Sequence, residues 1–402
     1  MGTMLLFIGS SIVYLLPCLL TLFVILAIIR IGNNKIVLTI FAGFILRLIA
    51  LFADYYDWFP VFGSGADTEV FHRIAMHNIE NGNIYVFTNY TIFLTLVYYI
   101  TDCSRFIAQY LNVLFGIGEM IFVYEALSLL KLSNKTIVLM MRVLAFLPMK
   151  ICFSAILLRE AWVFFFMALA VYYFVNWYVN EKKLSIFLSL CATLTASWMH
   201  AGCIFFAVTP LIALITYSHH TKRIKLSIGR IIAGSMVSLV FLVFLFANMD
   251  SFGQKLEEAD VETELVGRYS SKTEAGSKYL QWVDVNSPIQ GVLFSPLKMF
   301  YFLFSPIPFD WRGMTDLIGF IFDGMVYFLL CYNIYQNSRK RKISIDKISS
   351  IKKYLLIGFL LLTFVFSFGT STAGTAMRHR AKYLSVLIVL SSLCVKSTVS
   401  KK

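Results

Sequence analysis

Charged residues are scarce in this sequence: Asp, Glu, Lys and Arg make up only 14% of its 402 residues. A water-soluble chain usually carries about 25% charged residues on its surface. Hydrophobic residues instead make up 59%, and the 38 Phe and 21 Tyr exceed what one aqueous core of this size buries. This composition excludes a soluble enzyme, a disordered chain and a fibrous protein. It predicts an all-α, polytopic membrane protein.

Several signatures of chemistry are also missing. The seven cysteines form no CxxC pair and lie mostly inside apolar runs, so neither a disulfide framework nor a zinc site is expected. There is no Walker A loop and no Rossmann fingerprint after a strand, which argues against a nucleotide-driven pump. There is no HExxH motif, and the His and Asp residues are too scattered to name a metal site. We therefore expect no metal and no cofactor.

Long apolar runs fill most of the chain. A bilayer core about 30 Å thick requires about 20 apolar residues per helix. The first run is too long for a signal peptide and has no A-x-A cleavage pattern after it, so we interpret it as a retained span. We expect one integral membrane domain, residues 1–402, with roughly ten or eleven spans and with re-entrant or interfacial segments at 86–101 and 289–305. The predicted spans are 4–29, 36–53, 106–130, 136–158, 159–179, 184–199, 201–218, 229–248, 317–335, 354–368 and 381–395.

The net charge of +13 is interpreted as a topology signal rather than as a nucleic-acid surface, because basic residues accumulate in cytoplasmic loops. All strong Lys and Arg clusters are cytoplasmic together if 86–101 and 289–305 do not cross the membrane. Residues 336–353 then form a basic cytoplasmic loop attracted to anionic lipid, and residues 249–288 form an acidic outer loop. No nucleic acid partner is expected.

This topology places many ionisable residues near the ends of apolar runs on the same, outer face. Ionisable groups near hydrocarbon cost about 3 kcal/mol each on insertion scales, so they tend to face a cavity and serve a purpose. We therefore expect one external polar cavity. The residues are Asp54, Asp57, Asp67, Glu69, His72, Arg73, Arg105, Arg159, Glu160, His200, Asp310, Arg312, Arg378, His379, Arg380 and Lys382.

The first outer loop, residues 54–85, contains a predicted amphipathic helix that lies in the membrane interface. Asp67 is a good N-cap, and Gly82 is a good residue to follow the helix. Either the charges only cap the helix and face water, or Asp67 or Glu69 is a general base that activates a sugar hydroxyl. The predicted apolar face is Val70, Phe71, Ile74 and Ile79, opposite Glu69, His72, Arg73 and Glu80.

A basic group follows the small-residue loop 369–376. It consists of Arg378, His379, Arg380 and Lys382 at the outer end of a span. One interpretation is an interfacial anchor with snorkelling side chains. The other is a clamp in which guanidinium groups bind a diphosphate and stabilise its charge as it leaves.

Three further places have two interpretations each. Arg159 and Glu160 form either an ion pair at a helix start or an extension of the clamp, with Glu160 orienting Arg159. His200 is either a hydrogen-bonded loop residue or a participant in proton transfer. The turn 306–312 offers an aromatic side chain and an ion pair, which suit either an interfacial belt or glycan binding. The candidate glycan-binding residues are Trp311, Asp310, Arg312 and, in the first outer loop, Trp58.

These features together resemble bacterial integral-membrane enzymes that build surface polysaccharides. The loop Gly65-Ala66-Asp67-Thr68-Glu69-Val70-Phe71, the Arg159-Glu160 helix start and the loop Arg378-His379-Arg380 are most similar to O-antigen or capsule repeat-unit polymerases. The acidic first outer loop is also similar to C-type glycosyltransferases that use polyprenyl-phosphate sugars. The paired basic periplasmic loops of some polymerases, with their Arg-to-Gly spacing, have no counterpart in this sequence.

The resemblance implies a metal-independent polymerase in the bacterial cytoplasmic (inner) membrane. It would transfer a glycan from polyprenyl diphosphate, of the undecaprenyl type, onto a second lipid-linked repeat unit of lipopolysaccharide or capsule. Asp67, Glu69, His379 or His200 would be the base, and Arg378, Arg380, Lys382 and Arg159 would hold the diphosphate. A chain-length regulator is a conceivable partner. The alternatives are a C-type transferase that adds one sugar and a lipid-linked oligosaccharide flippase, which should carry midmembrane charges and two related halves.

Overall fold

The computed structural model describes residues 2–219, 221, 223–224, 228–247, 279–280, 288–340 and 347–395. Helices dominate these residues, as the composition predicts, and the only sheet among them pairs two strands of two residues each. The chain divides into two compact units, which are described separately: Met1–Glu125 with Ile137–Phe166, and Ala126–Thr136 with Met167–Lys402.

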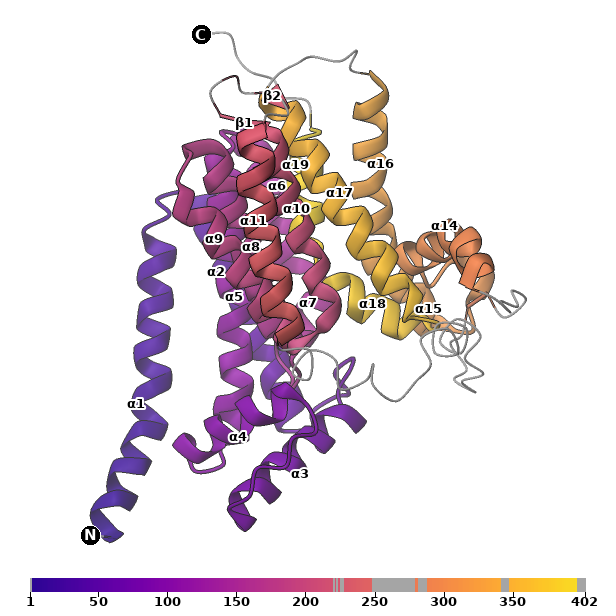
Figure 1. The fold of residues 1–402 in the computed structure, drawn as a ribbon. Coiled ribbons are helices and arrows are strands. Elements are labelled where there is room, and N and C mark those ends of the chain that lie inside the picture. The colour runs from indigo at the N-terminus through magenta and orange to yellow at the C-terminus, as the bar shows by residue number, and fades with distance from the viewer. Residues whose placement is uncertain are drawn as a thin grey trace. The chain divides into compact units, whose positions relative to one another are not determined.

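The first unit begins with three long helices and one short helical hairpin (Figure 1). Its core packs Leu51 of α2 and Val113 of α5 against Ala155, with Leu20 of α1 beside them. Its elements are α1 (Gly2–Ile29), α2 (Asn34–Tyr55), α3 (Ala66–Asn81), α4 (Asn89–Thr101), α5 (Arg105–Leu129), α6 (Asn134–Phe146), α7 (Pro148–Phe153) and the start of α8 (Glu160–Asn180).

The second unit takes up the rest of α8 and the C-terminal helices. In Figure 1, α10 and α11 lie side by side, and the two helices are in contact. Its further elements are α9 (Lys183–Met199), η1 (Ala201–Ala207), α10 (Val208–Thr216), β1 (Tyr217–Ser218), β2 (Arg223–Ile224), α11 (Ile228–Ala247), α14 (Pro288–Phe304), η2 (Pro308–Asp310), α15 (Met314–Gly319), the π-helical turn η3 (Phe320–Gly324), α16 (Met325–Lys340), α17 (Lys347–Phe368), α18 (Ala373–Ala381) and α19 (Leu384–Ser392).

Five helices in the described part of the chain are long and apolar enough to cross a membrane. Such helices indicate a membrane protein, but their number is below the predicted ten or eleven. They are Asn34–Tyr55, Arg105–Leu129, Glu160–Asn180, Met314–Asn337 and Ser350–Phe368; shorter apolar helices cover Pro17–Ile29, Lys183–Met199 and Ala201–Thr216.

The predicted span 136–158 is not one helix. It divides into α6 and α7, because Pro148 lacks the N–H that would continue the helix and instead begins the next one. Residues 154–159 are then irregular before α8 starts at Glu160. The fully buried Asn112 side chain donates to the carbonyls of Ile156 (2.7 Å) and Leu158 (2.9 Å), which supplies partners for this open backbone.

Two further predicted spans are also interrupted. The predicted span 381–395 contains the end of α18 and the nine-residue α19, and 201–218 begins as a 3₁₀ helix. The predicted acidic outer loop, residues 249–288, lies outside the described residues except for Tyr279, Leu280 and Pro288. In the basic loop 336–353, the residues 341–346 also lie outside them.

The predicted helix of the first outer loop exists, and it forms a hairpin with α4 (Figure 1). Gly82 follows it in the left-handed conformation, as expected, but the prediction that Asp67 is the N-cap is wrong. The helix starts two residues earlier: Gly65 is the N-cap, and the Thr68 hydroxyl accepts from its N–H (3.1 Å) and donates to its carbonyl (2.8 Å). Asp67 therefore lies in the first turn.

The buried face of α3 is shifted from the one predicted. Thr68, Phe71, Ala75 and Asn78 are buried, whereas Val70, Ile74 and Ile79 are only half-buried at its margins. Asn78 donates to Thr95 of α4 (3.0 Å) and exchanges hydrogen bonds with the backbone of Tyr85 in the connecting loop. At 13 residues, α4 is about 20 Å long, which is too short to cross a bilayer core.

Candidate functional site

An acidic cluster forms in the first unit where α2 ends and where α3 and α5 begin. We define it as Asp54, Glu69, Arg105 and Gln109. Arg105 Nη1 lies 2.7 Å from Glu69 Oε1, and its Nη2 lies 3.8 Å from Asp54 Oδ2. Gln109 Nε2 donates to the same Asp54 oxygen at 2.5 Å. One guanidinium thus bridges two carboxylates from different helices.

The two carboxylates of the acidic cluster differ in accessibility. The Asp54 side chain is only 3% exposed, whereas that of Glu69 is 46% exposed. A carboxylate that is held by a cation but still reached by solvent has a fixed position and an accessible oxygen. Glu69 meets this description, and Asp54 serves to hold Arg105.

A histidine and a tyrosine lie beside the acidic cluster. His72 Nδ1 is 2.7 Å from the Tyr98 hydroxyl, which joins α3 to α4. Burial lowers the pKa of His72 below its usual value; the nearby Arg105 charge lowers this pKa further, and Glu69 partly opposes the shift. His72 is therefore kept neutral at neutral pH and is not a cationic partner for Glu69.

The other candidates of the first unit lie at its surface. Asp67 is exposed in the first turn of α3, where a negative charge is favourable next to the helix N-terminus. Trp58 is exposed and stacks on Tyr56, with ring centroids 5.9 Å apart. Arg159 is half-buried just before α8, whose first residue, Glu160, is fully buried.

In the second unit, the structure brings two predicted residues together in what we call the histidine cluster: His200, His379, Phe366 and Lys382. The His200 and His379 rings meet edge to face, with centroids 5.0 Å apart, and both rings also contact Phe366. His379 Nδ1 lies 3.2 Å from the Thr370 hydroxyl. Lys382 is buried, with Nζ 5.8 Å from the Phe366 ring centre. Residues 179 positions apart in sequence thus share one polar site.

Arg380 does not face solvent, as the predicted diphosphate clamp would require. It is fully buried, its Nε and Nη2 atoms donate to Asp323 Oδ2, and its Nη1 atom donates to the carbonyls of Phe302 (3.1 Å) and Leu303 (2.9 Å) at the end of α14. Terminal helix carbonyls lack partners within their own helix, so Arg380 caps α14. This geometry favours a structural role for Arg380. Arg378, two positions earlier on α18, is half-exposed.

The turn 306–312 has a different ion pair from the one its sequence suggests. Arg312 makes two hydrogen bonds of 3.0 Å to Asp316, four residues further on. Trp311 Nε1 donates to the carbonyl of Pro306 (3.1 Å), which fixes the indole. Burial raises the pKa of Asp310, and the charge of Arg312 partly opposes this shift.

A buried charge triad, Arg47, Glu119 and Lys150, is absent from the sequence-based candidates. Lys150 Nζ lies 2.7 Å from Glu119 Oε1 and 3.3 Å from the centre of the Phe164 ring. Arg47 donates to Ser154 Oγ (2.9 Å) and to the carbonyl of Gly43 (3.0 Å). All three charged residues are fully buried. The sequence does indicate this triad, because Arg47 and Glu119 each interrupt an apolar run, where a charge needs a partner.

Packing around this triad is tight. A Cβ atom added at Gly116 would lie 2.8 Å from Ser154 Cβ and 3.0 Å from Arg47 Nε. A substrate therefore has no room there, and the triad holds helices together. Among the described residues, no three His, Cys, Asp or Glu side chains gather closely enough to hold a metal ion.

The acidic cluster supplies a fixed proton acceptor, and the histidine cluster supplies imidazoles and a cation at the ends of apolar helices. Taken separately, the acidic cluster of the first unit suits proton transfer, and the histidine cluster of the second unit suits anion binding. In comparisons with protein-family models, curated proteins and solved structures, the chain matches none.

Proposed function

We propose that this chain is a metal-independent glycosyltransferase of the bacterial cytoplasmic membrane. It joins a glycan carried on polyprenyl diphosphate to a second lipid-linked repeat unit at the outer leaflet. The observation that carries this proposal is the Glu69–Arg105 pair, 2.7 Å apart, with Glu69 half-exposed. An alcohol nucleophile needs a positioned acceptor for its proton, and Glu69 is one.

In this proposal, the reaction needs an acceptor for the hydroxyl proton and cations that stabilise the departing diphosphate. A sugar hydroxyl of the acceptor attacks the anomeric carbon of the donor, its proton passes to Glu69, and the bond to the diphosphate oxygen breaks. The departing lipid diphosphate carries away the negative charge, which cations stabilise. The residues predicted to bind this diphosphate, Arg378, His379 and Lys382, belong to the second unit, and Arg378 is partly exposed there. Arg380 does not contact the diphosphate in this proposal; it positions α14 by binding its last carbonyls.

The test is the glycan profile of a deletion strain complemented with single variants. Glu69→Gln should remove long-chain polysaccharide, whereas the matched control Glu80→Gln, on an exposed position of the same helix, should restore it. Arg378→Ala should also shorten the chains. Normal chain-length ladders with Glu69→Gln and Arg378→Ala, at normal protein levels, would overturn the proposal.

A second candidate function is a C-type transferase that adds one sugar from a polyprenyl monophosphate. The exposed position of Asp67 in the first turn of α3 favours it, because a substrate reaches this carboxylate directly. Asp67→Asn tests this candidate without removing much helix stability, because Asp67 is not the N-cap. Loss of a single side-branch sugar in the deletion strain indicates this transferase. Collapse of the ladder to one repeat indicates the polymerase, and accumulation of inner-leaflet precursor indicates a flippase.

A further inference from the structure

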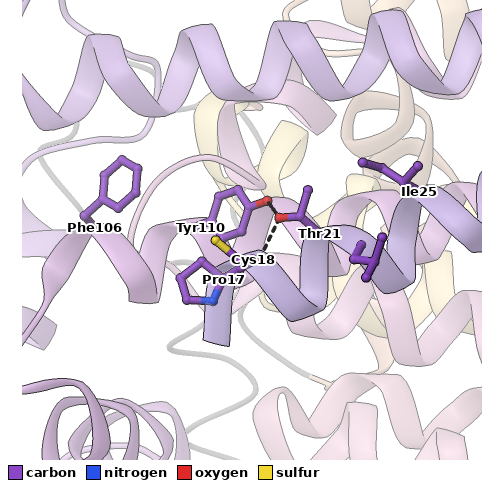
Figure 2. Close-up of a pocket in the computed structure, with 7 residues that line it drawn as sticks. Pro17, Cys18, Thr21, Ile25, Phe106 and Tyr110 are labelled. Atoms are coloured by element: carbon purple, nitrogen blue, oxygen red, sulfur yellow. Dashed lines mark hydrogen bonds between the residues drawn. The ribbon is translucent and has the colours of Figure 1, made fainter. Parts of the chain in front are cut away.

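An open groove lies between α1 and α5 in the first unit. Its volume is about 370 Å³, within the range of pockets that hold small ligands. It is lined by Pro17, Cys18, Thr21, Leu22 and Ile25 of α1 and by Phe106 and Tyr110 of α5. Figure 2 shows these side chains in a row, with Phe106 at one end and Ile25 at the other.

The residues of α1 that line the groove follow the helix axis. Pro17, Thr21 and Ile25 follow one another every four residues, which places them on one stripe of the helix. Eight residues at 1.5 Å each give the stripe a length of about 12 Å parallel to the helix axis. Small side chains at Cys18 and Thr21 leave the space that Phe106 and Tyr110 border.

The lining of the groove offers an occupant almost no polar partner. Its lining is almost entirely apolar, and its two hydroxyl groups already have partners. Thr21 Oγ1 donates to the carbonyl of Pro17 at 2.6 Å and is hydrogen-bonded to the Tyr110 hydroxyl (Figure 2). A polar headgroup would find no unmet hydrogen bond there. A hydrocarbon chain leaves no polar group of the groove unsatisfied.

The surroundings of the groove are continuous with the apolar outer face of α1. Leu15, Leu19, Phe23 and Leu26 are exposed on that helix, as residues that contact lipid are. A lipid acyl chain and a helix that enters the membrane both run roughly along the bilayer normal. An occupant that is linear, apolar and parallel to α1 therefore has the shape of an acyl chain.

We propose that this groove is a binding site for one acyl chain of a bilayer phospholipid. The chain lies along Pro17, Thr21 and Ile25 and contacts the rings of Phe106 and Tyr110, and it supports the packing of α1 against α5. This site is independent of the proposed enzymatic function.

The experiment uses the full chain in phosphatidylcholine vesicles that contain a trace of phosphatidylcholine with a photoreactive diazirine in one acyl chain. After irradiation, mass spectrometry maps the adducts. We expect labelling of residues 17–25 and 106–110 several-fold above that of the exposed apolar face of α2, which includes Leu38 and Phe41. Equal labelling of the two regions means ordinary lipid contact and overturns the proposal.

Variants that fill the groove sharpen this test. Cys18→Phe and Ile25→Trp should each reduce groove labelling several-fold, whereas Leu19→Phe, on an exposed position outside the groove, should not. Because one filled variant could fail to fold, the same result from either variant at wild-type protein yield is sufficient. Unchanged labelling in both variants overturns the proposal. Displacement of the label by a small amount of polyprenyl phosphate also overturns it, because the occupant would then be an isoprenoid chain.

Discussion

Two arginine-centred ion pairs, Arg105–Glu69 in the first unit and Arg380–Asp323 in the second, use the same chemistry in opposite surroundings. The Arg105 and Glu69 side chains are 22% and 46% exposed, whereas those of Arg380 and Asp323 are 0% and 1% exposed. The buried pair also captures two helix-end carbonyls, so all its contacts are internal. Only the accessible pair has a carboxylate that solvent reaches. Accessibility, rather than charge, therefore separates a candidate reactive pair from a structural one.

The largest expected effect comes from breaking the buried pair. Asp323→Asn leaves Arg380 as an uncompensated charge inside the helices, and the free energy of unfolding should fall by about 3–5 kcal/mol. Thermal unfolding of the purified chain in detergent measures this loss. The double variant Asp323→Leu with Arg380→Met removes both charges and should recover much of the stability. If Asp323→Asn unfolds like the wild type, the pair is not structural.

The buried triad of the first unit should respond unequally to its two partners. Glu119→Gln leaves Arg47 and Lys150 as two buried cations, and the free energy of unfolding should fall by about 3 kcal/mol. Lys150→Met keeps one positive and one negative charge, so its loss should be clearly smaller. Thermal unfolding of both variants gives the order. A larger loss with Lys150→Met would contradict this account of charge balance.

The accessible pair should matter more for activity than for stability. Glu69→Gln should change the free energy of unfolding by no more than about 1 kcal/mol, because Glu69 is nearly half exposed and Arg105 keeps Asp54 as a partner. If Glu69 is the base, polymerisation should fall by about 100-fold, the lower end of general-base contributions. Arg73→Ala, at an exposed position of the helix that carries Glu69, is the control, and Arg105→Lys, which keeps a positive charge beside Glu69, should retain part of the activity. A stability loss as large as that of Asp323→Asn would make this pair structural too.

The smallest effect is a pH dependence beside the accessible pair. Because burial lowers the pKa of His72 below its usual value of about 6.5, the unfolded chain binds this proton more readily than the folded one. The packing of α3 on α4 should therefore weaken as the pH falls below that value, and the loss should end once folded His72 is protonated. Hydrogen exchange of α3 amides at pH 7.5 and pH 5.5 measures this change. His72→Gln should abolish it; a persisting change would assign the proton to another group.

The sequence predicted helix chemistry well where the signal was local. The end of α3 at Gly82 is confirmed, because only a glycine readily takes the left-handed conformation that follows this helix. Its start was mispredicted by two residues, because Gly65 is the N-cap and the Thr68 hydroxyl accepts a hydrogen bond from the Gly65 N–H. The break at Pro148 was also readable from the sequence, but the long apolar run around it suggested a single span.

The sequence predicted which residues form the candidate sites better than it predicted which of them contact one another. His200 and His379 were both singled out, and their contact emerges only from the fold. Arg105 was recognised as a charge at the outer face but was not linked to Glu69. The charges inside apolar runs, Arg47, Glu119 and Asp323, were not predicted as partners, because their contacts lie far away in sequence.

The sequence alone determined that this chain is helical and apolar enough for a membrane, because hydrophobicity and helix periodicity are properties of consecutive residues. Only the tertiary structure decided which charges form buried ion pairs and which remain accessible to solvent. Arg378 and Arg380 are alike in sequence, yet Arg380 is buried against Asp323 and Arg378 is half-exposed. The physical reason is that burial and ion pairing depend on helices that meet in space, which no local pattern encodes.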